Sequence, residues 1–460
     1  MSSPRLPSDF VFGAATAAFQ IEGANHTDGR TDSIWDTFCR VDGAVINGDD
    51  GSIACDHYHR YPQDVALMKS LGLDAYRFSV SWPRVRPGHG AVNAKGVGFY
   101  DSLVDELLTA GIDPWLTLYH WDLPQELEDA GGWANRDTAY RFAEYALTVH
   151  EALGDRVNRW TTLNEPWCAA FLGYAAGAHA PGRQVPEAAI AAAHHLMLGH
   201  GLAVEALRSA DSSLQLGITL NLSVIDPLGP GDEDVARLID GQHNRIFLDP
   251  ILRGSYPQDV LDDLAHLWPS GLVHDGDLAT ISAPIDFLGV NYYHGEAVSL
   301  QPAAPREASE APTSRPTTTP FVASEGVFFH SRNLPRTAMD WEVQPEGLTR
   351  LLTRLHEEYP IALYVTENGA AYDDVVAEDG AVHDQNRIDF LEVHLDAVAD
   401  AIEQGADVRG YFYWSMLDNF EWAWGYAKRF GIVRVDYETL ERTPKDSALR
   451  YAQLIEAVRG

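Results

Sequence analysis

Cysteine is scarce in this chain of 460 residues, which contains only three. Cys39, Cys55 and Cys168 form no C-x-x-C pair, so we expect buried reduced thiols rather than a disulfide framework or a zinc site. Long apolar runs are missing as well: no stretch reaches about 18 apolar residues, and we expect no transmembrane helix. The N-terminal residues lack the apolar core of a signal peptide, which predicts a cytoplasmic location.

Basic residues are in the minority. The chain has 33 Lys and Arg against 67 Asp and Glu, which gives a net charge of −34. Because nucleic-acid-binding proteins need a basic surface, this balance argues against nucleic acid as a partner. The acidic residues are spread along the chain, as in a solvated surface. The composition suits a soluble enzyme for a neutral small molecule, and it indicates no oligomeric state.

Apolar segments of strand length alternate with amphipathic segments along the chain. The expected strands cover residues 10–16, 73–79, 113–119, 159–164, 215–222, 285–291, 361–366 and 408–414. The expected helices include residues 61–71, 98–110, 137–153, 187–209 and 387–404. Such alternation predicts an α/β protein with right-handed crossovers, and eight repeats predict a single (β/α)8 TIM barrel over residues 1–460. Neither a P-loop nor a G-x-G-x-x-G follows the first expected strand, which argues against a nucleotide-binding sheet.

Residues 299–340 interrupt this alternation. They are rich in Pro, Thr, Ser, Ala and Glu and have no clear period. A loop of this length in a compact domain is usually a lid, a binding rim or a mobile segment. It follows the sixth expected strand, so we expect it near the active-site rim, with other extended βα loops over the C-terminal face of the barrel.

Two glutamates stand at the ends of expected strands. Glu165 lies near the end of the run 160–166, and Glu367 lies near the end of the run 361–369. Carboxyl groups at the C-terminal ends of barrel strands point into the mouth where barrel enzymes act. Glycosidic bond cleavage needs two such groups, one to protonate the leaving oxygen and one to attack or to activate water. Glu165 and Glu367 are therefore the candidate catalytic pair.

Polar and aromatic residues also follow the other strands, so that seven of the eight strand ends carry them. Sugar hydroxyls need paired hydrogen-bond donors and acceptors, and the apolar face of a sugar ring stacks on indole. Convergence of such residues predicts a polar pocket with aromatic walls. The residues are Gln20, Arg77, His120, Trp121, Asn164, Asn291, Tyr293, Trp414, Glu421 and Trp422.

Each of these residues alone has a plain structural interpretation. Glu165 could be an acid in a first helical turn that starts at Pro166. Arg77 could form a structural ion pair, and His120 could be a satisfied core histidine. The segment 56–59 resembles a metal motif but lacks a third converging ligand, and no metal or organic cofactor is expected.

Six motifs in order resemble those of glycoside hydrolase family 1, the β-glucosidase and β-galactosidase family. The resemblance covers nearly the whole chain. It implies a retaining exo-β-glycosidase, with a β-glucosidase as the first expectation and a small β-glycoside or oligosaccharide as substrate. The motifs are residues 12–23, 76–82, 119–124, 162–166, 366–369 and 414–422.

The resemblance assigns roles to the two glutamates. It implies that Glu165 is the general acid/base and Glu367 the nucleophile, with Arg77 and Tyr293 holding the nucleophile. A cation and a hydroxyl donor favour the charged form of Glu367, and that charge favours the protonated form of Glu165. Retention of configuration implies carboxyl groups about 5–5.5 Å apart.

The resemblance also implies the substrate contacts. Asn164 is similar to the residue that binds the 2-hydroxyl, Trp414 to the stacking floor and Trp341 to the wall for the leaving group. The substrate-binding candidates are Gln20, His120, Trp121, Asn164, Asn291, Tyr293, Trp341, Trp414, Glu421, Trp422 and Phe430.

Three alternatives remain open. A branch for 6-phosphorylated sugars has Ser at the position of Glu421, Lys at Lys428 and Tyr at Phe430; only Lys428 fits, and Glu421 would repel a phosphate. A silent glycan-binding barrel is expected to lack one catalytic glutamate, but both are present. Transglycosylation uses the same two glutamates, and these residues do not distinguish glucose from galactose or fucose.

Overall fold

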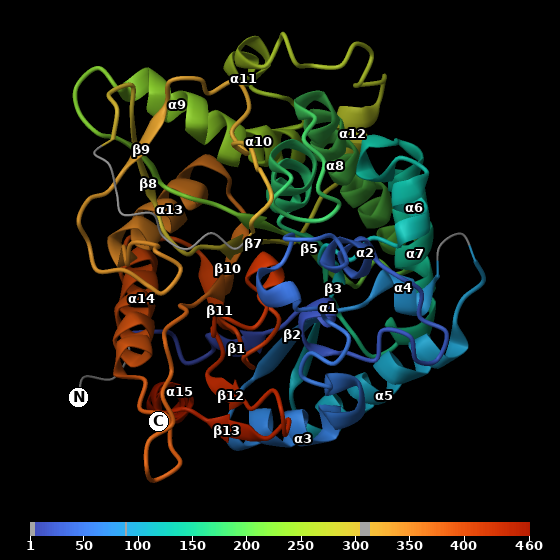
Figure 1. Cartoon of the computed structure of the whole chain (residues 1–460), viewed down its shortest axis with the longest axis vertical. Helices are drawn as coiled ribbons and strands as arrows, with labels where there is room; N and C mark the ends of the chain where they lie inside the picture. Colours follow the sequence, from blue (N-terminus) through green and yellow to red (C-terminus); the bar gives the residue numbers. More distant parts are fainter. Residues whose placement is uncertain (1–4, 88–89, 304–312) are drawn as a thin grey trace.

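Eight parallel strands close into a barrel in a computed structural model that describes residues 5–87, 90–303 and 313–460 (Figure 1). The order around the barrel is β1-β11-β10-β7-β5-β4-β3-β2. All eight strands lie where the sequence predicts them, which confirms the TIM barrel. They are β1 (Val11–Ala15), β2 (Ala75–Ser79), β3 (Asp113–Tyr119), β4 (Arg159–Asn164), β5 (Gln215–Asn221), β7 (Phe287–Asn291), β10 (Ala362–Asn368) and β11 (Val408–Trp414).

Helices surround the barrel (Figure 1). The five expected helical segments correspond to α3 (His57–Ser70), α5 (Ala94–Ala110), α7 (Asp137–Leu153), α8 (Pro186–Ala210) and α14 (Gln385–Glu403). Two further long helices are α13 (Pro345–Glu358) and α15 (Asp446–Arg459). The shorter helices are α1 (Ala18–Ile21), α2 (Ile34–Cys39), α4 (Trp82–Val85), α6 (Gln125–Asp129), α9 (Glu233–Asp240), α10 (Ile246–Arg253), α11 (Gln258–Asp263) and α12 (Asp277–Ile281).

The helix α13 was not among the expected helices, although its sequence carries a helical signal. Leu348, Leu351, Leu352 and Leu355 are buried and recur at spacings of three and four residues. This is the apolar stripe of an amphipathic helix. The helix is therefore one that the sequence could have predicted.

Aromatic rings from four strands fill the barrel interior towards the amino ends of the strands. The ring of Trp115 on β3 lies 5.4 Å from Phe287, 4.7 Å from Tyr364 and 4.8 Å from Phe412, measured between centroids. Gly13 on β1 makes room for this layer, because a Cβ there would lie 2.4 Å from the Phe412 ring. The packed layer leaves the carboxyl ends of the strands for polar side chains.

Two small sheets lie outside the barrel. One contains β6 (Ile225–Pro227), β8 (Glu296–Ser299) and β9 (Phe328–His330) in that order, and the other pairs β12 (Val433–Val435) with β13 (Arg442–Pro444). The segment 299–340, which showed no period in the sequence, thus contains the strand β9. Its residues 304–312 lie outside the described residues.

The two ends of the described chain meet on the barrel. The hydroxyl group of Tyr451 on α15 donates a hydrogen bond of 2.9 Å to the carbonyl of Gly13 on β1. This buried contact supports the prediction of one domain over residues 1–460, which stays a prediction.

A buried ionic network holds the loop after β11. The Lys445 ammonium donates to Asp418 Oδ1 at 2.7 Å and also to Asp374, and the side chains of all three are at most 2% exposed. Buried charges are tolerated only when they are paired in this way. Asp418 lies three residues before Glu421, so the network fixes the base of the loop that carries this glutamate.

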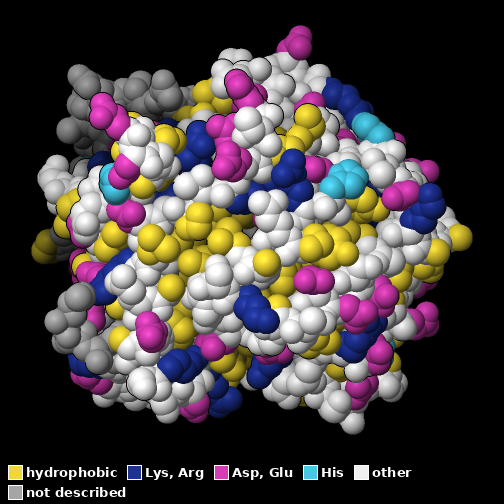
Figure 2. Space-filling model, turned by 90° about the horizontal axis from the view of Figure 1, so that it is seen from below, with side chains coloured by type: hydrophobic (Ala, Val, Ile, Leu, Met, Phe, Trp, Pro, Cys, Tyr) yellow, Lys and Arg dark blue, Asp and Glu magenta, His cyan; other side chains and the backbone are white. Residues whose placement is uncertain are grey.

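Charged side chains are mixed on the surface. On the face seen in Figure 2, Asp and Glu are scattered among Lys and Arg. No helix within the described ranges is long and apolar enough to cross a membrane. The cytoplasmic location stays a prediction.

Candidate active site

A cavity of about 490 Å³ opens at the carboxyl ends of the barrel strands. It brings together most of the residues that the sequence singles out, from strands far apart along the chain. The predicted residues on its wall are His120, Trp121, Glu165, Asn291, Tyr293, Trp341, Glu367, Trp414, Glu421, Trp422 and Phe430. Gln20, Arg77 and Asn164 are buried but do not line this cavity.

Glu165 follows directly after the last residue of β4. Its φ of 49° lies in the left-handed region, which is uncommon for a residue with a side chain. The conformation is held by a 2.9 Å hydrogen bond from its N–H group to the carbonyl of Thr219. Strained backbone of this kind persists where the surrounding structure fixes it. Glu165 is a cavity residue rather than only a helix-capping acid.

Glu367 is the second-to-last residue of the strand β10 and is 3% exposed. Arg77 Nη1 donates to its Oε1 at 2.6 Å, and the Tyr293 hydroxyl donates to its Oε2 at 2.7 Å. Burial raises the pKa of Glu367 above its ordinary value, although the charge of Arg77 and the hydrogen bond from Tyr293 oppose this rise. Both carboxylate oxygens are thus oriented by donors that favour the charged form.

Glu165 forms no ion pair with a cation among the described residues. Its Oε1 accepts a 2.6 Å hydrogen bond from Asn291 Nδ2. The hydroxyl of Thr366 donates to Asn291 Oδ1 at 2.8 Å, which turns the amide nitrogen towards Glu165. Burial, followed by the negative charge of Glu367, raises the pKa of Glu165 to about 8. The two glutamates therefore differ: the pKa of about 8 favours protonated Glu165 at neutral pH, whereas two donors favour the charged form of Glu367.

A chain of hydrogen bonds fixes the protonation of His120. Asn164 Oδ1 accepts from Arg77 Nη2 at 2.6 Å and from Asn291 Nδ2 at 3.1 Å. The Asn164 Nδ2 group consequently donates to His120 Nε2, 3.1 Å away. Burial, followed by the positive charge of Arg77, lowers the pKa of His120 well below its ordinary value. Neutral His120 then carries its proton on Nδ1, which has no hydrogen-bond partner within the described ranges.

Glu421 is a third carboxyl group at the same cavity. Burial, followed by the charges of Glu367 and Glu165, raises the pKa of Glu421 to about 8. A hydrogen bond from Gln20 acts in the opposite direction on the same pKa. Gln20 Nε2 also donates to Asn419 Oδ1 at 3.0 Å and to the Phe420 carbonyl at 2.8 Å. Gln20 thus supports the loop of Glu421, and its role as a direct sugar ligand stays a prediction.

Aromatic rings form the walls of the cavity. The rings of His120 and Trp414 are nearly parallel, at 5.7 Å between centroids and 20° between planes. Trp121 and Trp422 lie 4.6 Å apart on the same side. The ring of Trp341 packs against the ring of Tyr293, with 5.3 Å between centroids. Trp341 therefore lies on the same wall of the cavity as the tyrosine that holds Glu367.

Several wall residues were not predicted from the sequence. Trp167 and His294 stand next to predicted residues and could have been found from their positions in the same strand-end loops. His179 and Phe321 come from loops, and His243 from the helical segment Gly241–Arg245, none of which carries a motif. Cys168 also lines the cavity. Burial, followed by the charge of Glu165, raises the pKa of its thiol well above the ordinary value.

No metal site emerges from the side chains that the structure describes, where no group of three or more His, Cys, Asp or Glu residues could hold an ion. The metal-like segment 56–59 forms separate pairs. His57 Nδ1 lies 2.7 Å from Asp64 Oδ2, and His59 Nδ1 lies 2.6 Å from Asp56 Oδ1.

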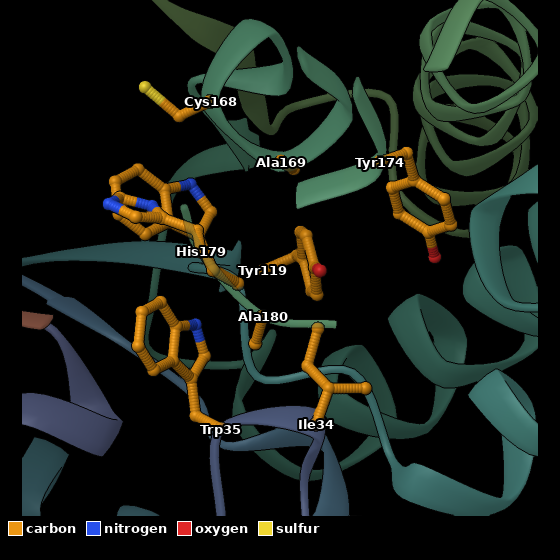
Figure 3. A pocket seen from close by; sticks show the side chains of 9 residues that line it. Ile34, Trp35, Tyr119, Cys168, Ala169, Tyr174, His179 and Ala180 are labelled. Carbon is orange, nitrogen blue, oxygen red and sulfur yellow. The ribbon is translucent and has the colours of Figure 1, made fainter. Parts of the chain in front are cut away.

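A much smaller pocket of about 10 Å³ adjoins the cavity and shares Trp121, Cys168 and His179 with it. Figure 3 shows Trp35 and Tyr119 beside this space, and the sulfur of Cys168 turned away from them. The volume matches a single water molecule and excludes a sugar. The site for a larger ligand is therefore the cavity that contains the glutamates.

Comparison with known proteins agrees with this arrangement. The family model described as Glycosyl hydrolase family 1 matches residues 2–459. The chain is 53% identical to thermostable β-glucosidase B of Thermobispora bispora, over 98% of this chain and 90% of that protein. A crystal structure of a psychrophilic β-glucosidase from Micrococcus antarcticus is 56% identical and covers 100% of both chains, with a TM-score of 0.98. The β-glucosidase of Thermotoga maritima in complex with castanospermine is 45% identical over 99% of both chains, with a TM-score of 0.92. On this evidence the chain belongs to glycosyl hydrolase family 1 and is a glycoside hydrolase.

Proposed function

We propose that this glycoside hydrolase is a retaining, exo-acting β-glucosidase that releases terminal β-D-glucosyl residues. The observation that carries the proposal is the contrast between the two glutamates. Glu367 is held charged by Arg77 and Tyr293, whereas Glu165 is held protonated by burial and by that charge. A nucleophile and an acid in one cavity are what double displacement requires. The names of the relatives support the choice of β-glucosidase.

In the first step, a carboxylate oxygen of Glu367 attacks the anomeric carbon of the sugar. The bond from that carbon to the glycosidic oxygen breaks, and Glu165 donates its proton to the departing oxygen. The products are a glycosyl ester on Glu367 and a free alcohol. Because the Glu367 oxygens are already fixed by two donors, the nucleophile needs little reorganisation.

In the second step, water releases the sugar. The ester on Glu367 carries no negative charge, so the pKa of Glu165 falls and Glu165 acts as a base. Glu165 takes a proton from water, the water oxygen bonds to the anomeric carbon, and Glu367 leaves as a carboxylate. Two inversions at the same carbon retain the β configuration.

The remaining cavity residues fit a neutral sugar. The Nδ1–H group of His120 is a buried donor without a hydrogen-bond partner among the described residues. Glu421 has two carboxyl oxygens that can bind sugar hydroxyls. Trp414 provides a ring face for stacking. Asn164 does not line the cavity and donates to His120, and its role as ligand of the 2-hydroxyl stays a prediction. Several structures of the Thermotoga maritima β-glucosidase contain sugar-like inhibitors such as castanospermine and deoxynojirimycin, which supports a small sugar as the occupant here.

The 6-phospho-β-glycosidase alternative is disfavoured by Glu421, which lies on the cavity wall, where its ionised form would repel a phosphate. Lys428 does not argue against this alternative. Its ammonium group lies 4.6 Å from the centroid of the ring of Trp424, which lines the cavity.

A panel of p-nitrophenyl β-D-glycosides tests the proposal. The panel contains the glucoside, galactoside, fucoside, xyloside and 6-phosphoglucoside, and kcat/KM is measured for each. We expect strong turnover of the unphosphorylated glucoside. Turnover of the phosphorylated sugar alone would contradict the role given to Glu421. A folded protein without turnover of any member would favour a silent glycan-binding barrel.

The pH dependence of kcat/KM should be bell-shaped. Glu165 must be protonated for glycosylation, so activity is expected to be full below the pKa of about 8 and to fall tenfold per pH unit above it. Glu367 must be charged, so activity also falls on the acidic side. A pH titration of kcat/KM with the p-nitrophenyl glucoside checks both limbs.

The alkaline limb has two candidate groups, because the pKa of Glu421 is also raised to about 8. The variants Glu165→Gln and Glu421→Gln separate them, each titrated with p-nitrophenyl β-D-glucoside, the substrate on which the wild-type limb is measured. The limb should disappear in Glu165→Gln and persist in Glu421→Gln. The reverse pattern would assign the limb to Glu421 and would argue against Glu165 as the acid.

A further inference from the structure

The strand β4 turns a different set of side chains into the barrel at its two ends. At its start, the Arg159 guanidinium group lies 5.2 Å from the centroid of the Trp115 ring, which is inside the barrel. Side chains alternate along a strand, so an even-numbered residue of β4 should point outwards. Asn164 nevertheless bonds to Arg77 and Asn291 inside the barrel. An extra residue must therefore lie between these two points.

The extra residue forms a β-bulge against the neighbouring strand β5. Thr161 on β4 pairs with Gly217 on β5. The next pair joins Asn164 to Thr219, so three steps along β4 match two steps along β5. Bulges of this kind re-aim side chains beside active sites. The bulge therefore sets the direction in which Asn164 and then Glu165 leave the strand.

Thr162 lies in this bulge, and its hydroxyl group contacts a histidine of the surrounding helix α8. Thr162 Oγ1 donates to the carbonyl of Gly217 at 3.3 Å and lies 2.7 Å from His200 Nδ1. Because the hydroxyl group has one proton, which the Gly217 carbonyl receives, His200 Nδ1 must donate to Thr162 Oγ1. The side chains of Thr162 and His200 are fully buried. The pair thus ties the bulge of β4 to α8 outside the barrel.

His200 makes no other side-chain hydrogen bond within the described ranges. Its Nε2 has no partner there, and His200 does not line the catalytic cavity. Burial lowers the pKa of His200 to about 3, so the ring is neutral at neutral pH. A neutral histidine behind the strand does not exchange protons with a substrate. What it supplies is a fixed donor for Thr162.

The two other histidines of α8 make different contacts. His194 Nδ1 lies 2.8 Å from the Tyr256 hydroxyl, and His195 Nδ1 lies 3.0 Å from the Trp133 carbonyl. His200 is thus the histidine of this helix that bonds to β4. Burying a polar ring with an unpaired nitrogen costs free energy. An apolar side chain would fill the space without this cost if packing were the only role of His200.

We propose that His200 is a positioning residue for the acid/base. Through Thr162 it holds the bulge of β4, and the bulge holds the Glu165 carboxyl group where proton transfer to the glycosidic oxygen needs it. The inference rests on the proposed function, because it concerns the step in which Glu165 donates its proton. Such placement matters, since a displacement of about 1 Å can lower the rate about 10²-fold.

Thr162→Val tests the inference with a side chain of nearly the same shape that lacks the hydroxyl group. The kcat/KM is measured on cellobiose, whose leaving group needs the acid, and on 2,4-dinitrophenyl β-D-glucoside, whose leaving group does not. We expect a loss of about ten- to thirtyfold on cellobiose and of less than about twofold on the aryl glucoside. A merely structural role would lower both values equally, because it would change only the fraction of folded protein. Thr162→Ser keeps the hydroxyl group and should stay within about threefold of the wild type on both substrates.

His200→Leu should reproduce the pattern of Thr162→Val. The double variant should lose no more on cellobiose than either single variant, because both changes break the same contact. His195→Leu is the matched control, since it removes a buried histidine of the same helix whose hydrogen bond goes to the Trp133 carbonyl. This control should leave the ratio of the two kcat/KM values unchanged.

Equal losses on the two substrates in Thr162→Val, or no loss on cellobiose in that folded variant, would overturn the positioning role. Losses that multiply in the double variant would also overturn it, because they would show two independent sites. If His200→Leu does not fold, Thr162→Val and Thr162→Ser decide the question. Absence of turnover of both substrates by the wild-type protein would instead overturn the proposed function.

Discussion

Glu367→Ala should lower kcat/KM on p-nitrophenyl β-D-glucoside by at least about 10⁴-fold, the scale expected when an enzymatic nucleophile is removed. The reason is that no other carboxylate in the cavity is held in the charged form by both a guanidinium group and a phenol within the described residues. Steady-state kinetics measure the loss. Circular dichroism and thermal melting of the variant check that the protein is folded.

Azide should restore turnover of this variant with an activated aryl glucoside. The alanine leaves space at the α face of the sugar, so azide attacks there once and the product is the α-glucosyl azide, with inverted configuration. Azide should not accelerate the wild-type enzyme in this way. Failure of azide, and of formate as a second nucleophile, to rescue a folded variant would argue against Glu367 as the nucleophile.

Glu165→Ala should separate substrates by their leaving groups. On cellobiose, whose leaving group is a poor one, kcat/KM should fall about 10³-fold because protonation is lost. On 2,4-dinitrophenyl β-D-glucoside it should stay within about tenfold of the wild type, because this leaving group departs without an acid. The kcat for the activated substrate should nevertheless be low, since water attacks the ester without a base.

Azide distinguishes this variant from the first one. In Glu165→Ala it should react with the glycosyl ester on Glu367 and give the β-glucosyl azide, with retained configuration. The two variants would then yield opposite anomers of one product. Equal losses of kcat/KM on good and poor leaving groups would show that Glu165 does not protonate the leaving oxygen.

The barrel and the catalytic pair could be predicted because their signals are local. Each strand is a short apolar run, and the residue that ends it faces the mouth whatever the loops do. Glu165 and Glu367 are such residues, and so is Asn291. The same rule would have found His294, which follows the predicted Tyr293 directly.

The division between the cavity wall and the layer behind it could not be predicted. Gln20, Arg77 and Asn164 are all near strand ends, yet they contact other side chains rather than the cavity. Which residue reaches the cavity depends on hydrogen bonds between different strands, and the sequence does not encode these in any short motif. The same applies to Phe321, which is contributed by the long segment after β7.

The anomeric configuration of the first-formed glucose tests the central claim most directly. Proton NMR during the first minutes of p-nitrophenyl β-D-glucoside hydrolysis, before mutarotation, distinguishes the two anomers. Double displacement through Glu367 predicts that β-D-glucose appears first and that the α anomer grows later by mutarotation. Initial release of α-D-glucose would show a single displacement and would contradict the roles assigned to both glutamates.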